Sequence, residues 1–78
     1  MYALKITSHA LRRMSERGVT EADIQQALAT PTMSMPGRPT GVTYIGPTVG
    51  KQRLAVCVVE PLERDKLVTI KSLYWRGR

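Results

Sequence analysis

Apolar side chains recur every three to four residues over the first third of the chain, which is the spacing of an α-helix. Residues 6–18 (ITSHALRRMSERG) follow this pattern. Thr7 or Ser8 can accept a hydrogen bond from the free backbone amides at a helix start, and Gly18 can take the left-handed conformation that often ends a helix. We therefore predict a first helix here. The side expected to pack on a sheet carries Ala10, Leu11, Met14 and Gly18.

A second helical pattern covers residues 19–31 (VTEADIQQALATP). Thr20 is a suitable N-cap, and Asp23 lies three residues later, close to the arrangement of a capping box. Proline lacks an amide hydrogen and does not continue a helix, so Pro31 marks its end. The sequence thus predicts two consecutive helices.

From residue 32 onward the pattern changes to short apolar runs between turn-forming residues. Residues 53–60 (RLAVCVVE) are apolar on both faces and predict a central strand. Residues 41–47 and 67–75 predict two further strands. Weaker patterns lie at residues 33–35, which suit a short edge strand, and at residues 3–6.

The order of these elements indicates an α+β fold. The strands follow the two helices and are joined by short turns, which connect antiparallel neighbours. We predict a single domain, residues 1–78, in which two N-terminal helices pack on one face of a three- to four-stranded antiparallel sheet. Two helices cover one face only, so the other face is open to solvent or to a partner.

Alternation along the last predicted strand separates its side chains into two sets, because successive side chains of a strand point to opposite faces. The sequence places Thr69 and Lys71 on the same face as each other. The full set on this face is Leu67, Thr69, Lys71, Leu73 and Trp75, and the opposite set is Val68, Ile70, Ser72 and Tyr74.

The charge of the chain narrows the choice of partners. Twelve Lys and Arg against six Asp and Glu give a net charge of +6. A surplus of this sign favours polyanions, and we expect RNA in particular. The alternatives are an anionic membrane, an acidic partner protein such as an antitoxin or immunity protein, or a basic surface without a partner.

Other classes of protein do not suit the sequence. A single cysteine, Cys57, permits no intramolecular disulfide, and its position in an apolar run predicts a buried thiol. No apolar run reaches the roughly 18 residues of a membrane span, and the N-terminus lacks a signal-peptide core. One Cys and one His do not build a zinc site of the usual spacing. We expect a cytoplasmic protein without a metal or cofactor.

The one histidine stands in line with two arginines on the first predicted helix. At about 100° per residue, Arg13 lies about 40° and Arg17 about 80° around the helix axis from His9, so the three form one helix edge. A neutral imidazole can take a proton from a ribose 2′-hydroxyl. A guanidinium can hold a phosphate and stabilise its added charge in the transition state. The edge is therefore a candidate site for action on RNA.

The same residues also have a structural interpretation. A histidine at a helix start often packs on the core and donates a hydrogen bond to a backbone carbonyl. Arg13 and Arg17 can pair with acids such as Glu16, or with the edge of the sheet. Spacing alone does not decide between the two interpretations.

The helix carries a specific pattern: His-Ala, two residues, Arg-Met, two residues, Arg-Gly and an aliphatic residue. In this chain the pattern is filled by His9, Ala10, Arg13, Met14, Arg17, Gly18 and Val19. It resembles the family catalogued as domain of unknown function 4258. The resemblance continues through a turn-rich link with Arg38, a strand with Tyr44, an apolar strand at residues 54–59 and a strand with Thr69, so it covers nearly the whole chain.

The resemblance implies a place near the small ribonuclease toxins of the barnase-, colicin- and RelE-like superfamily. It implies metal-independent cleavage in which the ribose 2′-oxygen attacks the adjacent phosphate. His9, Arg13 and Arg17 would then form the helix side of the active site, and Thr69 its sheet side. The substrate-binding candidates that accompany them are Lys71, Tyr44 and Arg38.

A ribonuclease with one histidine cannot use a pair of histidines as acid and base. The second proton-transfer role would need Tyr44, Tyr74, Lys71 or an arginine. Tyr44 and Trp75 are candidates for stacking on bases, although aromatic residues in small domains more often pack in the core.

Two functions of another class remain. One is a non-catalytic basic module that binds RNA, DNA or an acidic protein. The other is a homodimer in which the predicted edge at residues 33–39 pairs with a second copy.

Overall fold

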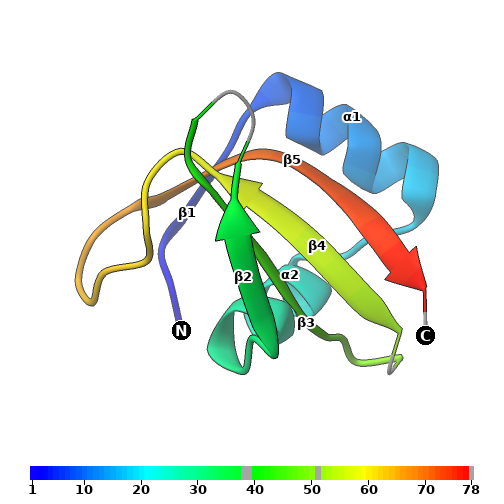
Figure 1. The fold of residues 1–78 in the computed structure, drawn as a ribbon. Coiled ribbons are helices and arrows are strands. Elements are labelled where there is room, and N and C mark those ends of the chain that lie inside the picture. Colours follow the sequence, from blue (N-terminus) through cyan, green and yellow to red (C-terminus); the bar gives the residue numbers. More distant parts are fainter. Residues whose placement is uncertain (38–39, 51, 78) are drawn as a thin grey trace.

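The structure is a computed structural model that describes residues 1–37, 40–50 and 52–77. These residues form two helices and five strands (Figure 1). The elements in chain order are β1 (Leu4–Ile6), α1 (Ser8–Arg17), α2 (Glu21–Ala29), β2 (Met33–Pro36), β3 (Val42–Pro47), β4 (Arg53–Val58) and β5 (Val68–Gly77).

Side-chain caps define the ends of both helices. Thr7 caps α1 by accepting a hydrogen bond from the amide of Ala10. Gly18 ends α1 with a φ of 65°, a conformation that glycine adopts readily because it has no Cβ. At the start of α2, Thr20 and Asp23 form a complete capping box, in which each side chain accepts from the other residue's backbone amide. The two predicted helices and their caps are confirmed.

The five strands form one mixed sheet in the order β1-β5-β4-β3-β2. β2, β3, β4 and β5 are antiparallel neighbours, whereas β1 pairs with β5 in parallel. The α+β class and the N-terminal helices are as predicted, but the expectation of a three- to four-stranded antiparallel sheet was wrong in detail. The first strand of the chain pairs with the last, and a contact between opposite ends of a chain has no local sequence pattern.

β5 contains an irregularity at Lys71. Ser72 pairs with Cys57 and Ile70 with Val58, so Lys71 is an extra residue between two consecutive pairs. An extra residue of this kind interrupts the alternation of side chains along a strand. The predicted alternation therefore fails beyond Lys71, and Leu73 lies in the same buried cluster as Ile70.

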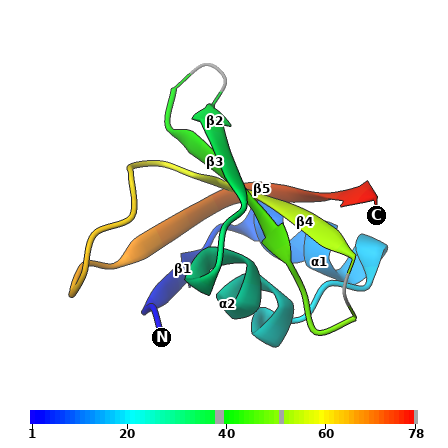
Figure 2. The same cartoon turned by 60° about the horizontal axis from the view of Figure 1, so that its bottom comes forward.

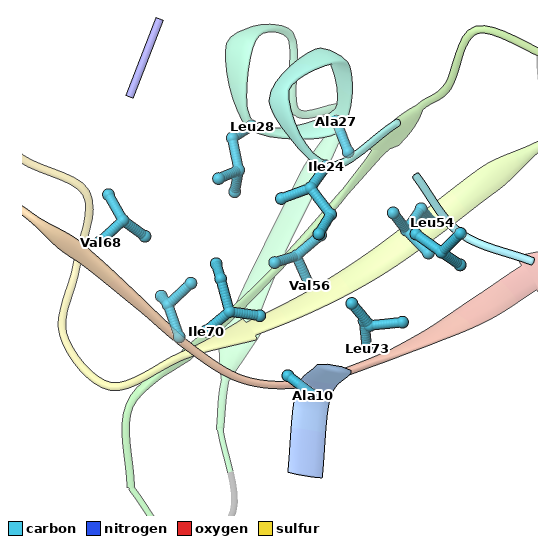
Figure 3. Close-up of a cluster of buried hydrophobic side chains, with 11 residues drawn as sticks. Ala10, Ile24, Ala27, Leu28, Leu54, Val56, Val68, Ile70 and Leu73 are labelled. Atoms are coloured by element: carbon cyan, nitrogen blue, oxygen red, sulfur yellow. The ribbon is translucent and has the colours of Figure 1, made fainter. Parts of the chain in front are cut away.

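Both helices pack on the same face of the sheet (Figure 2). Figure 3 shows the apolar cluster between the layers, where Ala10 of α1 and Ile24, Ala27 and Leu28 of α2 meet the strands. Removal of this apolar surface from water is the main force that holds the layers together. The strand residues of the cluster are Leu54, Val56, Val58, Val68, Ile70 and Leu73.

α2 rests directly on β3 at Gly46. A Cβ at this position would overlap the carbonyl oxygen of Ala27 and would lie 3.0 Å from its Cα. Glycine is thus the residue that allows the helix backbone to approach the strand so closely. Neither helix in the described part of the chain is long and apolar enough to span a membrane.

The second face of the sheet, called the open face below, carries no helix within the described residues. Cys57 points to this face, because its neighbours Val56 and Val58 belong to the cluster on the helix side. Its side chain is half-buried, and the hydroxyl of Thr43 donates to its Sγ at 3.4 Å. The expected buried thiol is therefore corrected to a half-buried thiol outside the main core.

Candidate functional site at the edge of α1

The first residues of α1 are tied to β5 at its irregular position. The backbone amide of Thr7 donates to the carbonyl of Ile70 at 3.2 Å, and the Thr7 hydroxyl lies 2.9 Å from the same oxygen. The hydroxyl also lies 3.3 Å from the carbonyl oxygen of Lys71. His9 follows Thr7 by two residues, so the structure brings the start of the His-Arg-Arg edge to the same part of the molecule as Lys71.

The last turn of α1 is also tied to β5. The Arg17 guanidinium donates from Nη1 to the carbonyl of Leu73 at 2.6 Å. In return, the indole Nε1 of Trp75 donates to the carbonyl of Arg17 at 2.7 Å. With contacts at both ends, α1 runs along β5 (Figure 1), and the edge that carries His9, Arg13 and Arg17 has a defined position beside the sheet.

His9 differs from the structural interpretation of the sequence. The residue is exposed, and among residues 1–37, 40–50 and 52–77 no hydrogen bond or ion pair involves its imidazole. It neither packs in the core cluster nor donates to a backbone carbonyl. The imidazole is therefore not engaged by the described part of the fold.

The two arginines make the contacts that the structural interpretation describes. Arg13 forms an ion pair with Glu16, with 2.7 Å between Nη1 and Oε1 and side chains that are 35 % and 48 % exposed. Arg17 binds the sheet edge through Leu73. A guanidinium has five N–H donors, so a single contact leaves others for a phosphate. Arg13 remains a possible phosphate ligand, whereas Arg17 first of all attaches the helix to the sheet.

Thr69 lies in a different environment from the helix edge. It is half-buried and lines a hollow of about 200 Å³ together with Glu60, Glu63 and Lys66. Lys66 Nζ donates to Glu63 at 2.9 Å, and this hydrogen bond raises the pKa of Lys66 above its ordinary value of 10.5. The walls of this hollow include two carboxylates and none of the three edge residues. Phosphate binding is therefore not favoured at Thr69.

The remaining predicted residues are distributed over the molecule. Tyr44 accepts a hydrogen bond from the amide of Leu62 at 3.0 Å, and it lines a hollow of about 290 Å³ beside β2. The Nζ of Lys71 donates to the carbonyl of Thr40 at 2.8 Å. Arg38 lies outside the described residues. Of the predicted substrate-binding residues, Lys71 is the one whose backbone lies beside the His9 end of α1, while its ammonium is held at Thr40.

Thr7 is a functional candidate that the sequence pointed to only as a helix cap. Its hydroxyl joins the helix start to β5 as well, which makes it a positioning residue for His9. The sequence indicated this role only through a threonine at the N-cap, whose hydroxyl can donate one further hydrogen bond. The acceptor of that bond is the carbonyl of Ile70, which lies far along the chain.

In the part of the chain that the structure describes, no three His, Cys, Asp or Glu side chains are grouped so that they could hold a metal ion. The model of the family described as Domain of unknown function (DUF4258) matches residues 6–75 of the chain. Searches among curated proteins and solved structures gave no match.

Proposed function

Because the chain belongs to the DUF4258 family, described as a domain of unknown function, we propose a function from its own site: a cytoplasmic, metal-independent ribonuclease that holds RNA at the edge of α1. The observation that carries this proposal is the state of His9. The histidine is exposed and has no partner among the described residues, and it stands one helical turn before Arg13. A structural histidine would use its ring nitrogens within the fold.

The proposed reaction needs one base and a way to stabilise charge. His9 takes the proton of the ribose 2′-hydroxyl. The 2′-oxygen forms a bond to the adjacent phosphorus while the bond from phosphorus to the 5′-oxygen breaks. The products are a 2′,3′-cyclic phosphate and a 5′-hydroxyl that takes its proton from solvent water. Arg13 binds the phosphate and stabilises the added negative charge in the transition state.

Charge around the edge supports RNA as the ligand. Two of the three edge residues, Arg13 and Arg17, are cations, and α1 carries one acid, Glu16. The backbone of Lys71 contacts Thr7, but its ammonium lies at the carbonyl of Thr40 and is not part of this cluster. A cluster of cations holds a polyanion largely by releasing its counterions, so binding of this kind weakens as salt concentration rises.

The proposal is tested by incubating the protein with RNA in excess EDTA. The matched variants are His9→Ala, Arg13→Ala and Arg12→Ala, each shown to be folded by circular dichroism. Arg12→Ala removes the same charge as Arg13→Ala from a neighbouring position outside the edge. We expect cleavage by the wild type and by Arg12→Ala, strong loss in Arg13→Ala, and none in His9→Ala.

The product ends identify the chemistry. Cleavage by 2′-oxygen attack leaves 2′,3′-cyclic phosphates, and an oligonucleotide with one 2′-deoxy residue at the cleaved position should resist. Equal activity of the wild type and His9→Ala would refute the assignment. RNA binding without cleavage would instead support a second candidate function, that of a non-catalytic RNA-binding module. The observation that favours this second candidate is the ion pair of Arg13 with Glu16, because the pair occupies part of the Arg13 guanidinium.

A further inference from the structure

The open face of the sheet carries two cross-strand rows of side chains. Residues that are directly paired on neighbouring strands point to the same face. One row therefore runs from β5 to β2 through Tyr74, Ala55, Ile45 and Met33. The next row contains Ser72, Cys57, Thr43 and Met35.

The position of Tyr74 follows from its neighbours. Leu73 belongs to the cluster on the helix side, and Trp75 packs against that cluster and binds the end of α1. The pairing is regular from Ser72 to Trp75, so Tyr74 points away from the helices. It is the one aromatic side chain among the two rows.

The row beside Tyr74 is covered although no helix lies on this face within the described residues. Ala55 has 0 % and Ile45 1 % of its surface exposed, while Met33 at the end of the row is 50 % exposed. Tyr74, which pairs with Ala55 and is itself half-buried, is one of the larger side chains that flank these two residues. A tyrosine ring that lies along a sheet presents one of its faces outward, which is the geometry needed for stacking on a base.

The charges of the strands match a polyanion. All six acids of the chain lie outside the strands, in α1, in α2 and in the loop between β4 and β5. The strands contain four cations, Lys5, Arg53, Lys71 and Arg76. Acidic side chains come close to the strands at one end of β5, where Glu60 and Glu63 line the same hollow as Thr69.

We propose that the open face of the sheet is a binding platform for single-stranded RNA, on which a base stacks on Tyr74 and the backbone is held by cations of the strands. The platform rests on the proposed action on RNA and names its substrate class. Single strands fit because stacking on an aromatic side chain needs an unpaired base, whereas duplex RNA offers its bases only at the ends. The cations along the strands oppose a second copy of this basic chain on the same face.

The first experiment measures binding of the wild-type protein to a short oligouridylate with 2′-O-methyl groups, which cannot be cut by 2′-oxygen attack. Tyr74→Phe keeps the ring and Tyr74→Leu removes it. We expect Tyr74→Phe to bind like the wild type and Tyr74→Leu to bind about tenfold more weakly, the usual effect of losing one stacked base. A duplex of the same length should bind more weakly than the single strand and should not distinguish the two variants.

A second pair of variants tests the location without touching Tyr74. Met33→Glu places a negative charge at the end of the row. Leu67→Glu places the same charge outside the row, on a residue that is 59 % exposed and so comparable to Met33. We expect Met33→Glu to weaken binding of the oligouridylate more than Leu67→Glu. Circular dichroism of each variant separates a loss of binding from a loss of folding.

The outcomes separate the platform from the ribonuclease. Weaker binding in Tyr74→Leu and in Met33→Glu supports the platform, whether or not the EDTA assay shows cleavage. Unchanged binding in both variants overturns the platform and leaves the ribonuclease assay standing. A dimer in sedimentation that dissociates in Met33→Glu, without any binding of the oligouridylate, also overturns the platform, because a second copy then occupies the open face.

Discussion

The indole Nε1 of Trp75 donates a hydrogen bond of 2.7 Å to the backbone carbonyl of Arg17, while the Arg17 guanidinium donates one of 2.6 Å to the carbonyl of Leu73. The two residues thus join the last turn of α1 to β5 in both directions. An arginine that the sequence suggests as a phosphate ligand is engaged in holding the helix against the sheet. Removal of the Arg17 side chain should therefore mainly lower the stability of the fold, rather than act directly on the proposed cleavage of RNA.

Replacement of Arg17 by alanine should lower the free energy of unfolding by about 1 to 2 kcal/mol, because the carbonyl of Leu73 loses its charged donor. Arg12→Ala removes the same charge from an exposed position and should change stability by less than about 0.5 kcal/mol. Urea denaturation of both variants measures the difference. Equal stability of the two, together with loss of RNA binding in Arg17→Ala alone, would instead identify Arg17 as a phosphate ligand.

Thr7 should prove more important than an ordinary helix cap. Thr7→Val removes both the acceptor for the amide of Ala10 and the donor to the carbonyl of Ile70, and we expect a loss of about 1 to 2 kcal/mol. Thr7→Ser keeps the hydroxyl and should stay within about 0.5 kcal/mol of the wild type. Thermal or urea unfolding measures both. A Thr7→Val variant as stable as the wild type would show that the hydroxyl does not hold the helix start, and an unstable Thr7→Ser would show that the methyl group contributes as well.

Glu16 should compete with RNA for Arg13. Glu16→Gln removes the carboxylate of an exposed ion pair, which contributes little to stability, so the loss should be below about 0.5 kcal/mol. RNA affinity should rise about two- to fivefold, because Arg13 is released and one repulsive charge is gone. Glu21→Gln makes the same change of charge in α2 and is the control. Binding titrations at two salt concentrations measure the effect, and an equal rise in both variants would place the RNA away from Arg13.

Gly46 should be far less tolerant of a side chain than Gly50. Gly46→Ala forces the added methyl against the backbone of Ala27, and overpacking of this kind costs about 1 to 3 kcal/mol. A Cβ at Gly50 meets no atom within 4 Å, so Gly50→Ala should be close to neutral. Chemical denaturation compares the two variants. If Gly46→Ala is as stable as the wild type, α2 can move away from β3 without loss of packing.

For the proposed site, the sequence pointed to the helix edge but not to the state of each residue. The spacing of His9, Arg13 and Arg17 follows from helix geometry alone. Whether a side chain is free or paired depends on neighbours: Glu16 is close in sequence, but Leu73, the partner of Arg17, comes from the last strand. Thr69 was grouped with the edge through family resemblance, and the structure surrounds it with the acids of a loop.

The sequence by itself determined the two helices, their caps and the approximate positions of the longer strands, because periodicity and caps such as Thr20 with Asp23 depend on residues within a few positions of one another. Only the tertiary structure decided that β1 joins the sheet parallel to β5, that Lys71 interrupts the alternation of the last strand, and that Tyr74 therefore lies on the open face. These features depend on pairing between distant segments. Such pairing is selected by the packing of the whole core, which no single stretch of the sequence contains.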